Sequence, residues 1–533
     1  MRSPVYAARG AVATSQPLAA QAGLAMLREG GTAVDAAVAA AITLAVVQPG
    51  SNDLGGDLFA LVWDGTRLHG LNASGRSPAA LTRELMAASA QPPPAALGGT
   101  QASAATAPPA RGWLPVTVPG APAGWHDLHG RFGRLPFERL FDDAIRYAES
   151  GFPVSPATAR NWAAAVRVHA NVDDPAVAHW ARTFTFGGRP PTAGERFANP
   201  AAGRALRLIS GSHVRDFYSG AIAEAVVRHA RATGGLLTGA DLAAHESTWA
   251  QPMSTGYRGH EVHELPPNGQ GVAALQAFAL LDGLPGTPGV HQQIEAMKLG
   301  FADAHAYVAD PATGALPDLL DPSYLDARRA LIGERAAEPA PGDPMRGGTV
   351  YLAAADADGM MVSLIQSTYM GFGSFVTIPE YGFGLQNRGA GFSLDPAHPN
   401  VAAGGKRPFH TIIPGFLTHG GEPVGPFGVM GGHMQPQGHL QLVLATVDGL
   451  DPQAALARPR WYWASGLDVL VEPEFDPATV SDLRERGHQV RVIDDRGTFG
   501  MGQAIWRLTG SDGEFAGYIA GSEPRADGQA APY

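Results

Sequence analysis

The chain has 533 residues, of which 45% are hydrophobic and 16% are charged, and its formal net charge is −11. This is the composition of a globular protein with a large core, and it excludes an intrinsically disordered chain. The sequence has no basic run, which argues against a nucleic-acid partner, and no cysteine, which excludes disulfides, thiolate catalysis and cysteine-based zinc sites. The length allows about three or four average domains, or one large α/β domain.

The start of the chain, MRSPVYAARGAVATSQP, lacks the apolar stretch of a secretory signal. The most apolar run, residues 36–47, is too short and too rich in alanine to span a bilayer, which takes about 20 apolar residues. It predicts a buried helix instead. We therefore expect a cytoplasmic protein with no membrane partner.

Local signals in the first part of the chain predict two helices, a hairpin and a loop. Residues 17–28 begin with proline and are followed by two glycines, which predicts one helix, and a second is expected at about residues 35–47. The apolar runs LFALVW and LHGLNA flank Asp64-Gly65, a dipeptide typical of β-hairpins. Residues 89–112 are rich in Ala, Pro, Gly, Gln and Ser, which predicts a flexible loop.

The middle of the chain is predicted to be mainly helical, with helical patterns dominating residues 125–244. The strand GHEVHELP, the turn Asn268–Gly271 and the helix VAALQAFALL follow. In this strand His260 and His263 would face opposite sides, which suits no shared metal. Residues 333–348 are rich in Pro, Gly and charge, which predicts a flexible linker.

After the linker the pattern changes to β-strands. TVYLAAA and MMVSLIQS flank the turn Asp356–Gly359, a strong hairpin signal, and HTIIPGFLTH and EPVGPFGVM predict further strands. A helix is expected at about residues 436–447, and another between the cap Asp476-Pro477 and the stop at Gly487. The chain is thus predicted to mix helices and sheet, with a β-rich last third.

The junction Gly348-Thr349 joins the linker to the first of these strands and has a chemical interpretation. A threonine hydroxyl can attack the carbonyl of the preceding residue, and Gly348 leaves that approach unobstructed. Hydrolysis of the resulting ester would give Thr349 a free α-amine, whose ordinary pKa of about 7.7–8.0 lets it take the proton from Oγ1. A threonine with its N-terminal amine is a known activated nucleophile. From these residues alone, an ordinary loop before a strand stays the simpler interpretation.

Several longer stretches resemble, in the right order along almost the whole chain, the γ-glutamyltranspeptidase family of N-terminal nucleophile hydrolases. They are DLGGDLFALVW, TVPGAPAGW, ELPPNGQGVAALQ, EAMKLGFADAHAYVADP, TVYLAAADADGMMVSLIQS, GKRPFHTIIP and VMGGHMQPQ. The resemblance implies the α/β (α+β) class, with a four-layer αββα sandwich, and self-cleavage at Gly348-Thr349. A large fragment, residues 1–348, and a small fragment, residues 349–533, would then form one domain, and a homodimer of such pairs stays open.

The resemblance also implies a catalytic apparatus. Thr349 would be the residue that cuts its own chain and then attacks the substrate, and Ser367 would orient the Thr349 hydroxyl. The glycine pair Gly431-Gly432 would form the oxyanion hole, because glycine amides can approach a substrate closely. No cofactor and no metal are implied.

Three further residues are implied in substrate binding. Arg76 would bind a substrate carboxylate, for which the planar guanidinium is well suited. His410 and Thr411 stand where transpeptidases have two serines that hold the same carboxylate, and both can donate a hydrogen bond.

The chain departs from the transpeptidase pattern where that pattern binds the ammonium of an amino acid. The asparagine, glutamine and aspartate used there are replaced by Tyr369, Arg388 and Gly391. An arginine near an ammonium is repulsive, so the site suits a small anionic amide without an α-amino group. The runs IQSTY, GFGS and QNRGAGFSLDP are similar to the branch that includes oxamate amidohydrolase and cephalosporin-acylase-like enzymes.

We therefore expect an amidohydrolase that cleaves a small carboxylate-bearing, oxamate-like amide through an acyl-enzyme on Thr349. The alternatives are a γ-glutamyltransferase or glutathione hydrolase with a recast amine site, and a cephalosporin (glutaryl) acylase-like enzyme. A third alternative is an unprocessed binding protein with the same fold and no catalysis. Ammonia release from oxamate, release of a γ-glutamyl chromophore and the fragments on a denaturing gel separate these hypotheses.

Overall fold

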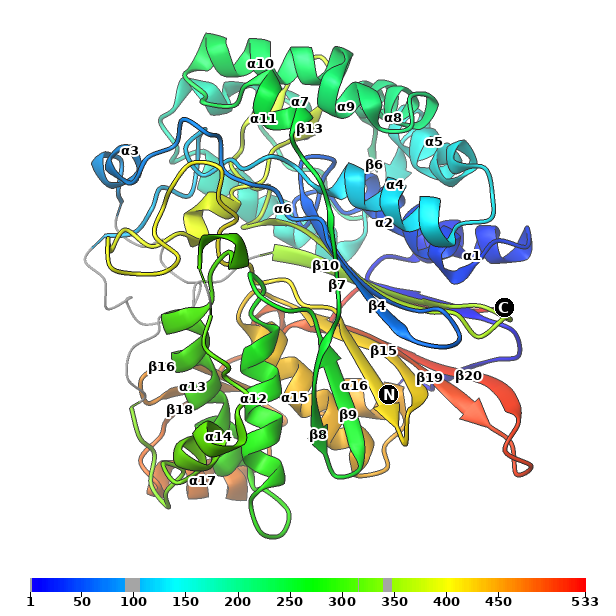
Figure 1. Ribbon diagram of the computed structural model, residues 1–533. Helices are drawn as coiled ribbons and strands as arrows, with labels where there is room; N and C mark the ends of the chain where they lie inside the picture. Colours follow the sequence, from blue (N-terminus) through cyan, green and yellow to red (C-terminus); the bar gives the residue numbers. More distant parts are fainter. Residues whose placement is uncertain (1, 92–105, 315, 339–347) are drawn as a thin grey trace.

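The computed structural model describes residues 2–91, 106–314, 316–338 and 348–533 (Figure 1). Most of the predicted loop at 89–112 and of the predicted linker at 333–348 lies outside these residues. Two antiparallel seven-stranded sheets lie face to face in the middle of the molecule, and helices cover the outer face of each (Figure 1). The predicted four-layer αββα sandwich is confirmed.

The first sheet, called the Thr349 sheet, has the order β21-β2-β10-β11-β3-β4-β7. Its strands are β2 (Ala11–Thr14), β3 (Asp57–Trp63), β4 (Leu68–Asn72), β7 (Thr248–Ala250), β10 (Gly348–Ala355), β11 (Met361–Tyr369) and β21 (Gln529–Pro532). The second, called the Gly431 sheet, has the order β1-β20-β19-β15-β14-β9-β8. Its strands are β1 (Val5–Ala7), β8 (Met253–Tyr257), β9 (His260–Glu264), β14 (Gly415–His419), β15 (Glu422–Met430), β19 (Met501–Thr509) and β20 (Phe515–Ser522).

Each sheet interleaves strands from both sides of residue 348. In the Thr349 sheet, β10 lies between β2, from the first part of the chain, and β11, from the second. In the Gly431 sheet, β14 pairs with β9 across the same division. A cut after Gly348 would therefore leave two fragments that share both sheets.

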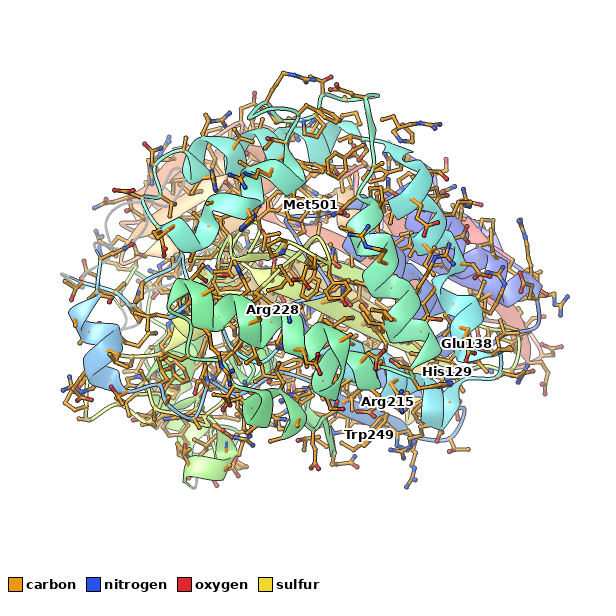
Figure 2. The ribbon with its side chains drawn as sticks, turned by 90° about the horizontal axis from the view of Figure 1, so that it is seen from above. His129, Glu138, Arg215, Arg228, Trp249 and Met501 are labelled. Atoms are coloured by element: carbon orange, nitrogen blue, oxygen red, sulfur yellow. The ribbon has the colours of Figure 1, made fainter. Side chains whose placement is uncertain are left out.

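The outer layer over the Thr349 sheet is formed by helices of the first part of the chain. They are α1 (Pro17–Arg28), α2 (Ala33–Val47), α4 (Ala121–Phe132), α5 (Asp142–Ser150), α6 (Pro156–His169), α7 (Ala178–Phe184), α8 (Pro200–Gly211), α9 (Arg215–Ser219), α10 (Ala221–Thr233) and α11 (Gly239–Ala243). The short helix α3 (Arg83–Ala88) packs apart from them, with Met86 against Leu81, Phe392 and Ala402. Figure 2 shows this layer from above, with His129 on α4 and Arg228 on α10. The predicted helical stretch at residues 125–244 is confirmed, with short strands β5 (Phe152–Pro153) and β6 (Arg196–Phe197) inside it.

The outer layer over the Gly431 sheet combines helices from both parts of the chain. They are α12 (Gly271–Asp282), α13 (Val290–Tyr307), α14 (Pro322–Arg329), α15 (Met434–Val447), α16 (Pro452–Ala457) and α17 (Pro477–Glu485). A small sheet of β16 (Trp461–Ser465), β17 (Asp468–Val471) and β18 (Gln489–Val492) packs beside them, and β12 (Thr377–Ile378) pairs with β13 (Phe383–Gly384) elsewhere. Among the described helices, none is both long enough and apolar enough to cross a membrane.

The strands of the Thr349 sheet alternate between two cores. In β10, Leu352 and Ala354 pack with the helices, whereas Tyr351 and Ala353 pack against the Gly431 sheet. Because side chains of a strand alternate with a period of two, this parity directs Thr349 to the face between the sheets. The predicted site is therefore an inter-sheet site at the start of β10.

The predicted strand HTIIPGFLTH is shorter than expected, because β14 covers only Gly415–His419. Pro414 has no N–H to donate to a ladder, and the backbone of His410 bonds instead to Asn268 and Gln270. The segment before β14 thus runs past the start of α12. These backbone hydrogen bonds bring His410 and Thr411 into the inter-sheet site.

Candidate active site

A β-bulge shapes the backbone around Thr349. The register of β10 and β11 shifts between Gly348 and Val350, so that two residues of β11 lie opposite Thr349 alone. Bulges bend a strand and re-aim its side chains, and they are frequent beside active sites. Tyr369, which follows the bulge, has a positive φ of 78°, a strained conformation for a bulky residue. Its N–H donates to Ser367 Oγ at 2.8 Å and so fixes that hydroxyl beside Thr349.

The Thr349 hydroxyl is held from two sides. Thr349 Oγ1 donates to Ser367 Oγ at 3.3 Å and accepts from Gln435 Nε2 at 3.4 Å. The side chain of Thr349 is buried, with 3% of its surface exposed. The predicted contact between Ser367 and Thr349 is thus present, and Gln435 is a second partner that the sequence does not reveal.

Arg388 lies in the same cluster and is fully buried. Its Nη1 donates to Thr411 Oγ1 at 2.8 Å, its Nη2 donates to Ser367 Oγ at 3.1 Å, and its guanidinium stacks on the Tyr369 ring at 4.2 Å. Burial lowers the pKa of Arg388 to about 10, so the group stays charged at neutral pH. Among the described residues, no carboxylate forms an ion pair with Arg388, and its Nε–H has no acceptor. The structure therefore places an unpaired cation beside the predicted nucleophile.

Asp57 is the buried carboxylate of this region. It lies directly opposite Ser367 in the β3–β11 ladder. Its Oδ1 accepts from the N–H groups of Gly75 and Gly120 at 3.0 and 3.2 Å and from Gln386 Nε2 at 2.9 Å. Burial raises the pKa of Asp57 to about 7, against the opposing charge of Arg388. Asp57 is thus fixed by amide donors and is only partly ionised near neutral pH.

His410 is bonded within the protein at both ring nitrogens. Nε2 lies 3.1 Å from Asp57 Oδ2, and Nδ1 accepts from the Ile412 N–H at 3.3 Å. Burial holds the pKa of His410 well below its usual range, so the ring is neutral and donates from Nε2 to Asp57. In this arrangement His410 supports Asp57, and Thr411 is the member of the predicted pair that reaches Arg388.

Gly431 and Gly432 connect β15 to α15, and both have positive φ, 133° and 60°. Their carbonyls are used: Gly431 accepts from the Met434 N–H at 3.0 Å, and Gly432 accepts from Gln270 Nε2 at 3.0 Å. In the part of the chain that the structure describes, neither glycine N–H donates a hydrogen bond. The two donors that an oxyanion hole requires are therefore left free at the end of the strand that precedes Gln435.

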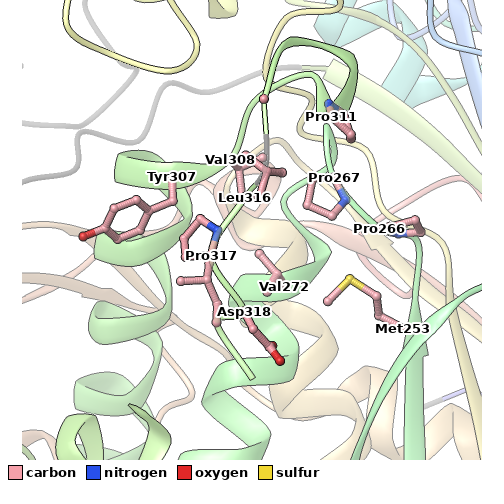
Figure 3. A pocket seen from close by; sticks show the side chains of 12 residues that line it. Met253, Pro266, Pro267, Val272, Tyr307, Val308, Pro311, Leu316, Pro317 and Asp318 are labelled. Atoms are coloured by element: carbon pink, nitrogen blue, oxygen red, sulfur yellow. The ribbon is translucent and has the colours of Figure 1, made fainter. Parts of the chain in front are cut away.

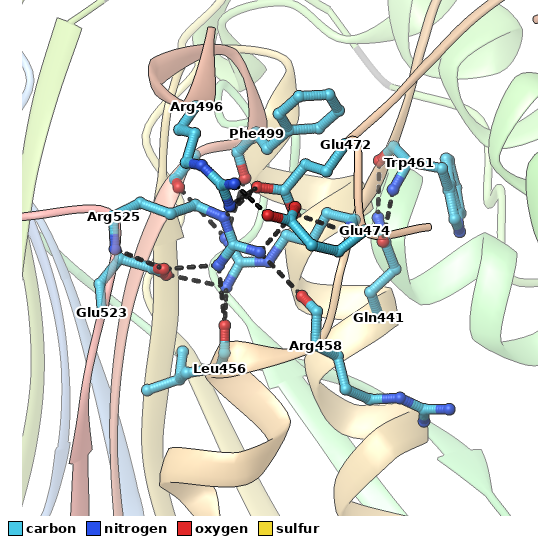
Figure 4. Close-up of polar contacts among 12 residues, drawn as sticks. Gln441, Leu456, Arg458, Trp461, Glu472, Glu474, Arg496, Phe499, Glu523 and Arg525 are labelled. Carbon is cyan, nitrogen blue, oxygen red and sulfur yellow. Dashed lines mark hydrogen bonds and ion pairs between the residues drawn. The ribbon is translucent and has the colours of Figure 1, made fainter. Parts of the chain in front are cut away.

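A buried network of charges stands behind this turn (Figure 4). A Cβ on Gly431 would lie 3.2 Å from Gly500 Cα, so the two backbones are in contact. Arg460 Nη1 donates to the carbonyls of Phe499 and Gly500 at 2.8 and 3.2 Å. Arg460 and Arg525 are in turn paired with Glu523 and Glu472, and all four side chains are almost fully buried. The network fixes the segment on which the glycine turn rests.

Arg76 lies apart from the Arg388 cluster in its contacts. Its Nη1 donates to Asp310 Oδ2 at 2.6 Å and to the Gly405 carbonyl at 3.2 Å, and 41% of its side chain is exposed. Two of its three nitrogens form none of these bonds. Arg76 is thus an accessible cation held by Asp310, and its predicted role in carboxylate binding stays a prediction.

The residue after Asp310 lines a largely apolar cavity of about 370 Å³ (Figure 3). Pro311, which follows Asp310, lines it together with Pro266, Pro267 and Tyr307. None of the predicted site residues lines it. The cavity is therefore a separate feature from the Thr349 cluster.

One group of described residues has the side chains of a metal site. Possible ligand atoms of His291, Glu295 and His488 lie within 4.8 Å of one another. However, Lys298 Nζ donates to Glu295 Oε1 at 2.8 Å, and the two histidine rings are joined by a hydrogen bond of 2.9 Å. A buried ammonium already meets the carboxylate here, and it would repel a divalent cation. The cluster is thus arranged as a hydrogen-bonded network.

The fold is that of N-terminal nucleophile hydrolases of the γ-glutamyltranspeptidase type, which act on amide bonds. The sequence model described as gamma-glutamyltranspeptidase matches residues 19–533. The chain belongs to the γ-glutamyltranspeptidase family and is an enzyme of amide chemistry, which confirms the resemblance seen in the sequence.

Three relatives sharpen this placement. The glutathione hydrolase-like YwrD proenzyme of Bacillus subtilis is 35% identical over 549 residues, 99% of each chain. The oxamate amidohydrolase proenzyme of Klebsiella pneumoniae is 35% identical over 555 residues, 100% of each chain. The crystal structure of a cephalosporin acylase from Bacillus halodurans superposes with a TM-score of 0.93 at 47% identity, covering 100% of this chain and 97% of the other.

Two functional candidates are missing from the sequence prediction. Gln435 stands in the stretch VMGGHMQPQ, but only the helix start at Met434 brings its amide to Thr349. Asp57 stands in DLGGDLFALVW, and only the β3–β11 register places it opposite Ser367. Both stretches carried the family resemblance, which is the one signal that could have drawn attention to them.

Proposed function

We propose that the chain is a self-cleaving amidohydrolase that uses Thr349 to hydrolyse the amide of a small carboxylate-bearing, oxamate-like substrate. The observation that carries the proposal is Arg388. A fully buried guanidinium with no carboxylate partner is costly, and this one lies one hydroxyl away from Thr349. A substrate carboxylate would supply the missing negative charge.

Maturation would begin with attack of Thr349 Oγ1 on the carbonyl carbon of Gly348. The C–N bond to Thr349 breaks as the new C–O bond forms, and the proton of Oγ1 passes to the nitrogen that becomes the α-amine. Water then hydrolyses the ester between Gly348 and Oγ1. The products would be residues 1–348 and residues 349–533, held together by the sheets that they share.

Substrate hydrolysis would use the same oxygen. The α-amine takes the Oγ1 proton as Oγ1 attacks the amide carbon, and the N–H groups of Gly431 and Gly432 would stabilise the oxyanion. The amine returns the proton to the leaving nitrogen, which departs as ammonia, and water hydrolyses the acyl-enzyme. Arg388 and Thr411 would hold the carboxylate, with Arg76 at the accessible side.

Replacement of the predicted nucleophile tests this proposal most directly. Thr349→Ala should remain a single chain and should have no amidase activity, because one oxygen performs both reactions. Denaturing gels and N-terminal sequencing of the wild type should show two fragments, with threonine at the start of the smaller. A Thr349→Ala protein that is cut at this bond or active would overturn the mechanism.

Substrate comparison separates the alternatives. Ammonia release from oxamate should exceed release of a γ-glutamyl chromophore, because Tyr369, Arg388 and Gly391 replace the groups that hold an amino-acid ammonium. Strong γ-glutamyl turnover with none on oxamate would favour the glutathione hydrolase alternative.

A second candidate is an acylase for larger carboxylate-bearing acyl groups. It is favoured by the similarity to the cephalosporin acylase of Bacillus halodurans, at 47% identity over the whole chain. Glutaryl amides test it, since they keep the terminal carboxylate and lengthen the acyl chain. Cytoplasmic location and pairing into homodimers stay predictions.

A further inference from the structure

Gln435 is the second contact of the Thr349 hydroxyl, and it comes from the start of α15, which follows β15 of the Gly431 sheet. It stands in the first turn of α15, and its N–H donates to the Gly432 carbonyl at 3.2 Å. Its side chain is fully buried. The residue therefore joins the glycine turn to the start of β10.

The orientation of the Gln435 amide is set by its other end. Oε1 accepts from the Ile413 N–H at 2.9 Å. A side-chain amide has one acceptor atom and one donor atom, so this bond forces Nε2 toward Thr349. Nε2 then donates to Thr349 Oγ1 at 3.4 Å.

The Thr349 hydroxyl makes two hydrogen bonds with side chains. Thr349 Oγ1 has one proton, which it donates to Ser367, and two lone pairs, of which one accepts from Gln435. Within the described residues no other donor reaches Oγ1. The contacts with Ser367 and Gln435 together fix the orientation of the Thr349 hydroxyl.

We propose that Gln435 is a further catalytic residue, which orients the Thr349 hydroxyl for attack on the carbonyl. The role rests on the proposed function of Thr349 and extends it, because it assigns one group to both self-cleavage and substrate hydrolysis. Orientation of a reacting atom is worth much of an enzymatic barrier, and small misplacements cost large factors in rate.

Gln437 provides a matched control in the same helix. It is also fully buried, and within the described part of the chain its amide bonds only to the backbone of His433 and Trp463, at 3.1, 3.2 and 2.7 Å. Gln435→Met and Gln437→Met remove the same polar group from similar surroundings. A purely structural role of Gln435 would make the two variants alike in activity.

The expected result is a selective loss of rate. In Gln435→Met, kcat on the best amide substrate and the rate of self-cleavage should both fall by about 10–100-fold, with KM changed less than about threefold. Gln437→Met should keep both rates within about threefold of wild type, even where its melting temperature falls. Equal rates in Gln435→Met and wild type would overturn the inference, as would equal losses in the two variants.

Gln435→Glu adds a readout that a structural role would not move. An ionised carboxyl keeps the acceptor for Ile413 but cannot donate to Oγ1, whereas a protonated carboxyl can. The activity of this variant relative to wild type should therefore rise as pH falls. A ratio that does not change with pH would contradict the donor role.

Failure of this inference is distinguishable from failure of the proposed function. If wild type is neither cut at Gly348 nor active on amides, the function of Thr349 fails. If wild type is cut and active while Gln435→Met matches it, only the role of Gln435 fails.

Discussion

Two regions of this molecule bury arginines almost completely, and they differ in whether the arginine has a carboxylate partner. In the segment that contacts the glycine turn, Arg460 and Arg525 meet the buried carboxylates of Glu472 and Glu523, and the part-exposed Arg496 lies 3.6 Å from Glu472 (Figure 4). Beside Thr349, Arg388 meets two hydroxyls and an aromatic ring. The arginines of the first region have carboxylate partners. Among the described residues, Arg388 in the second region has none.

The state of Asp57 strengthens this contrast. Burial raises the pKa of Asp57 to about 7, although the charge of Arg388 lowers it, so this carboxyl is only partly ionised near neutral pH. Among the described residues, Asp57 forms no ion pair with Arg388 and is bonded to His410 instead. The comparison shows that Arg460 and Arg525 have carboxylate partners, whereas Arg388 has none among the described residues; under the proposed function, a substrate carboxylate would be its partner.

The largest expected effect is a loss of stability when the ion pairs around Arg525 are broken. Arg525→Met would leave Glu472 and Glu523 buried with too little positive charge, and loss of one partner of a buried pair costs about 3–5 kcal/mol. Chemical denaturation of the variant and wild type measures this difference. If the free energy of unfolding falls by less than about 1 kcal/mol, the contrast fails, because the ion pairs would then not be needed to stabilise this region.

The next largest effect is expected at Arg388, and it should be a loss of activity. Arg388→Met should lower kcat/KM for a carboxylate-bearing amide by about 10²–10³-fold, because a buried carboxylate would lose its charged partner. The stability should stay within about 1 kcal/mol of wild type or rise, since an uncompensated buried charge is removed.

Arg388→Lys serves as the control for this effect, because it keeps the charge but loses the fork that bridges Ser367 and Thr411. It should retain part of the activity. A strong loss of stability in Arg388→Met, equal to that of Arg525→Met, would show that Arg388 is also a structural charge.

The smallest effect is a pH dependence that sharpens the comparison. The folded-state pKa of Asp57, about 7, lies above the ordinary value of 3.8, so the folded chain binds this proton more tightly than the unfolded chain. Its contribution to stability is present below pH 4 and is lost as pH rises through 7, by about 3 kcal/mol between pH 5 and pH 8.

Asp57→Asn removes this titration, so the free energy of unfolding of the variant should fall less than that of wild type over the same pH range. The difference between the two proteins isolates Asp57 from other titrating groups such as Asp53. Parallel pH curves would mean that Asp57 stays ionised in the fold and acts as the counter-ion of Arg388.

Much of the fold could be predicted from the sequence, because its signals are local. The cap Asp476, the first-turn Pro477 and the stop at Gly487 bound α17 as predicted, and the Asp-Gly turns mark both hairpins of the Thr349 sheet. Each signal depends on the conformation of a few adjacent residues. Helix α13 and the small sheet of β16, β17 and β18 were not predicted, because no such boundary signals were identified for them in the sequence.

The sequence predicted most members of the site and the contact between Ser367 and Thr349, but it missed Gln435, Asp57 and the remaining contacts. Thr349, Ser367, Tyr369, Arg388 and Thr411 do lie together, as their places in the family pattern imply. The orientation of Arg388 and the ion pair of Arg76 with Asp310 depend on residues 21 to 234 positions apart. Such contacts are set by packing of the whole chain, which no short pattern records.

The interleaving of strands has a consequence for the life of the protein after the proposed cut. The intact chain can refold as one molecule, at a rate that does not depend on concentration, and β10 can then find its place between β2 and β11. Once the peptide after Gly348 is broken, refolding requires two different polypeptides to meet and becomes a second-order process. The precursor would thus serve as its own assembly template, used once, and the mature enzyme would depend on never unfolding.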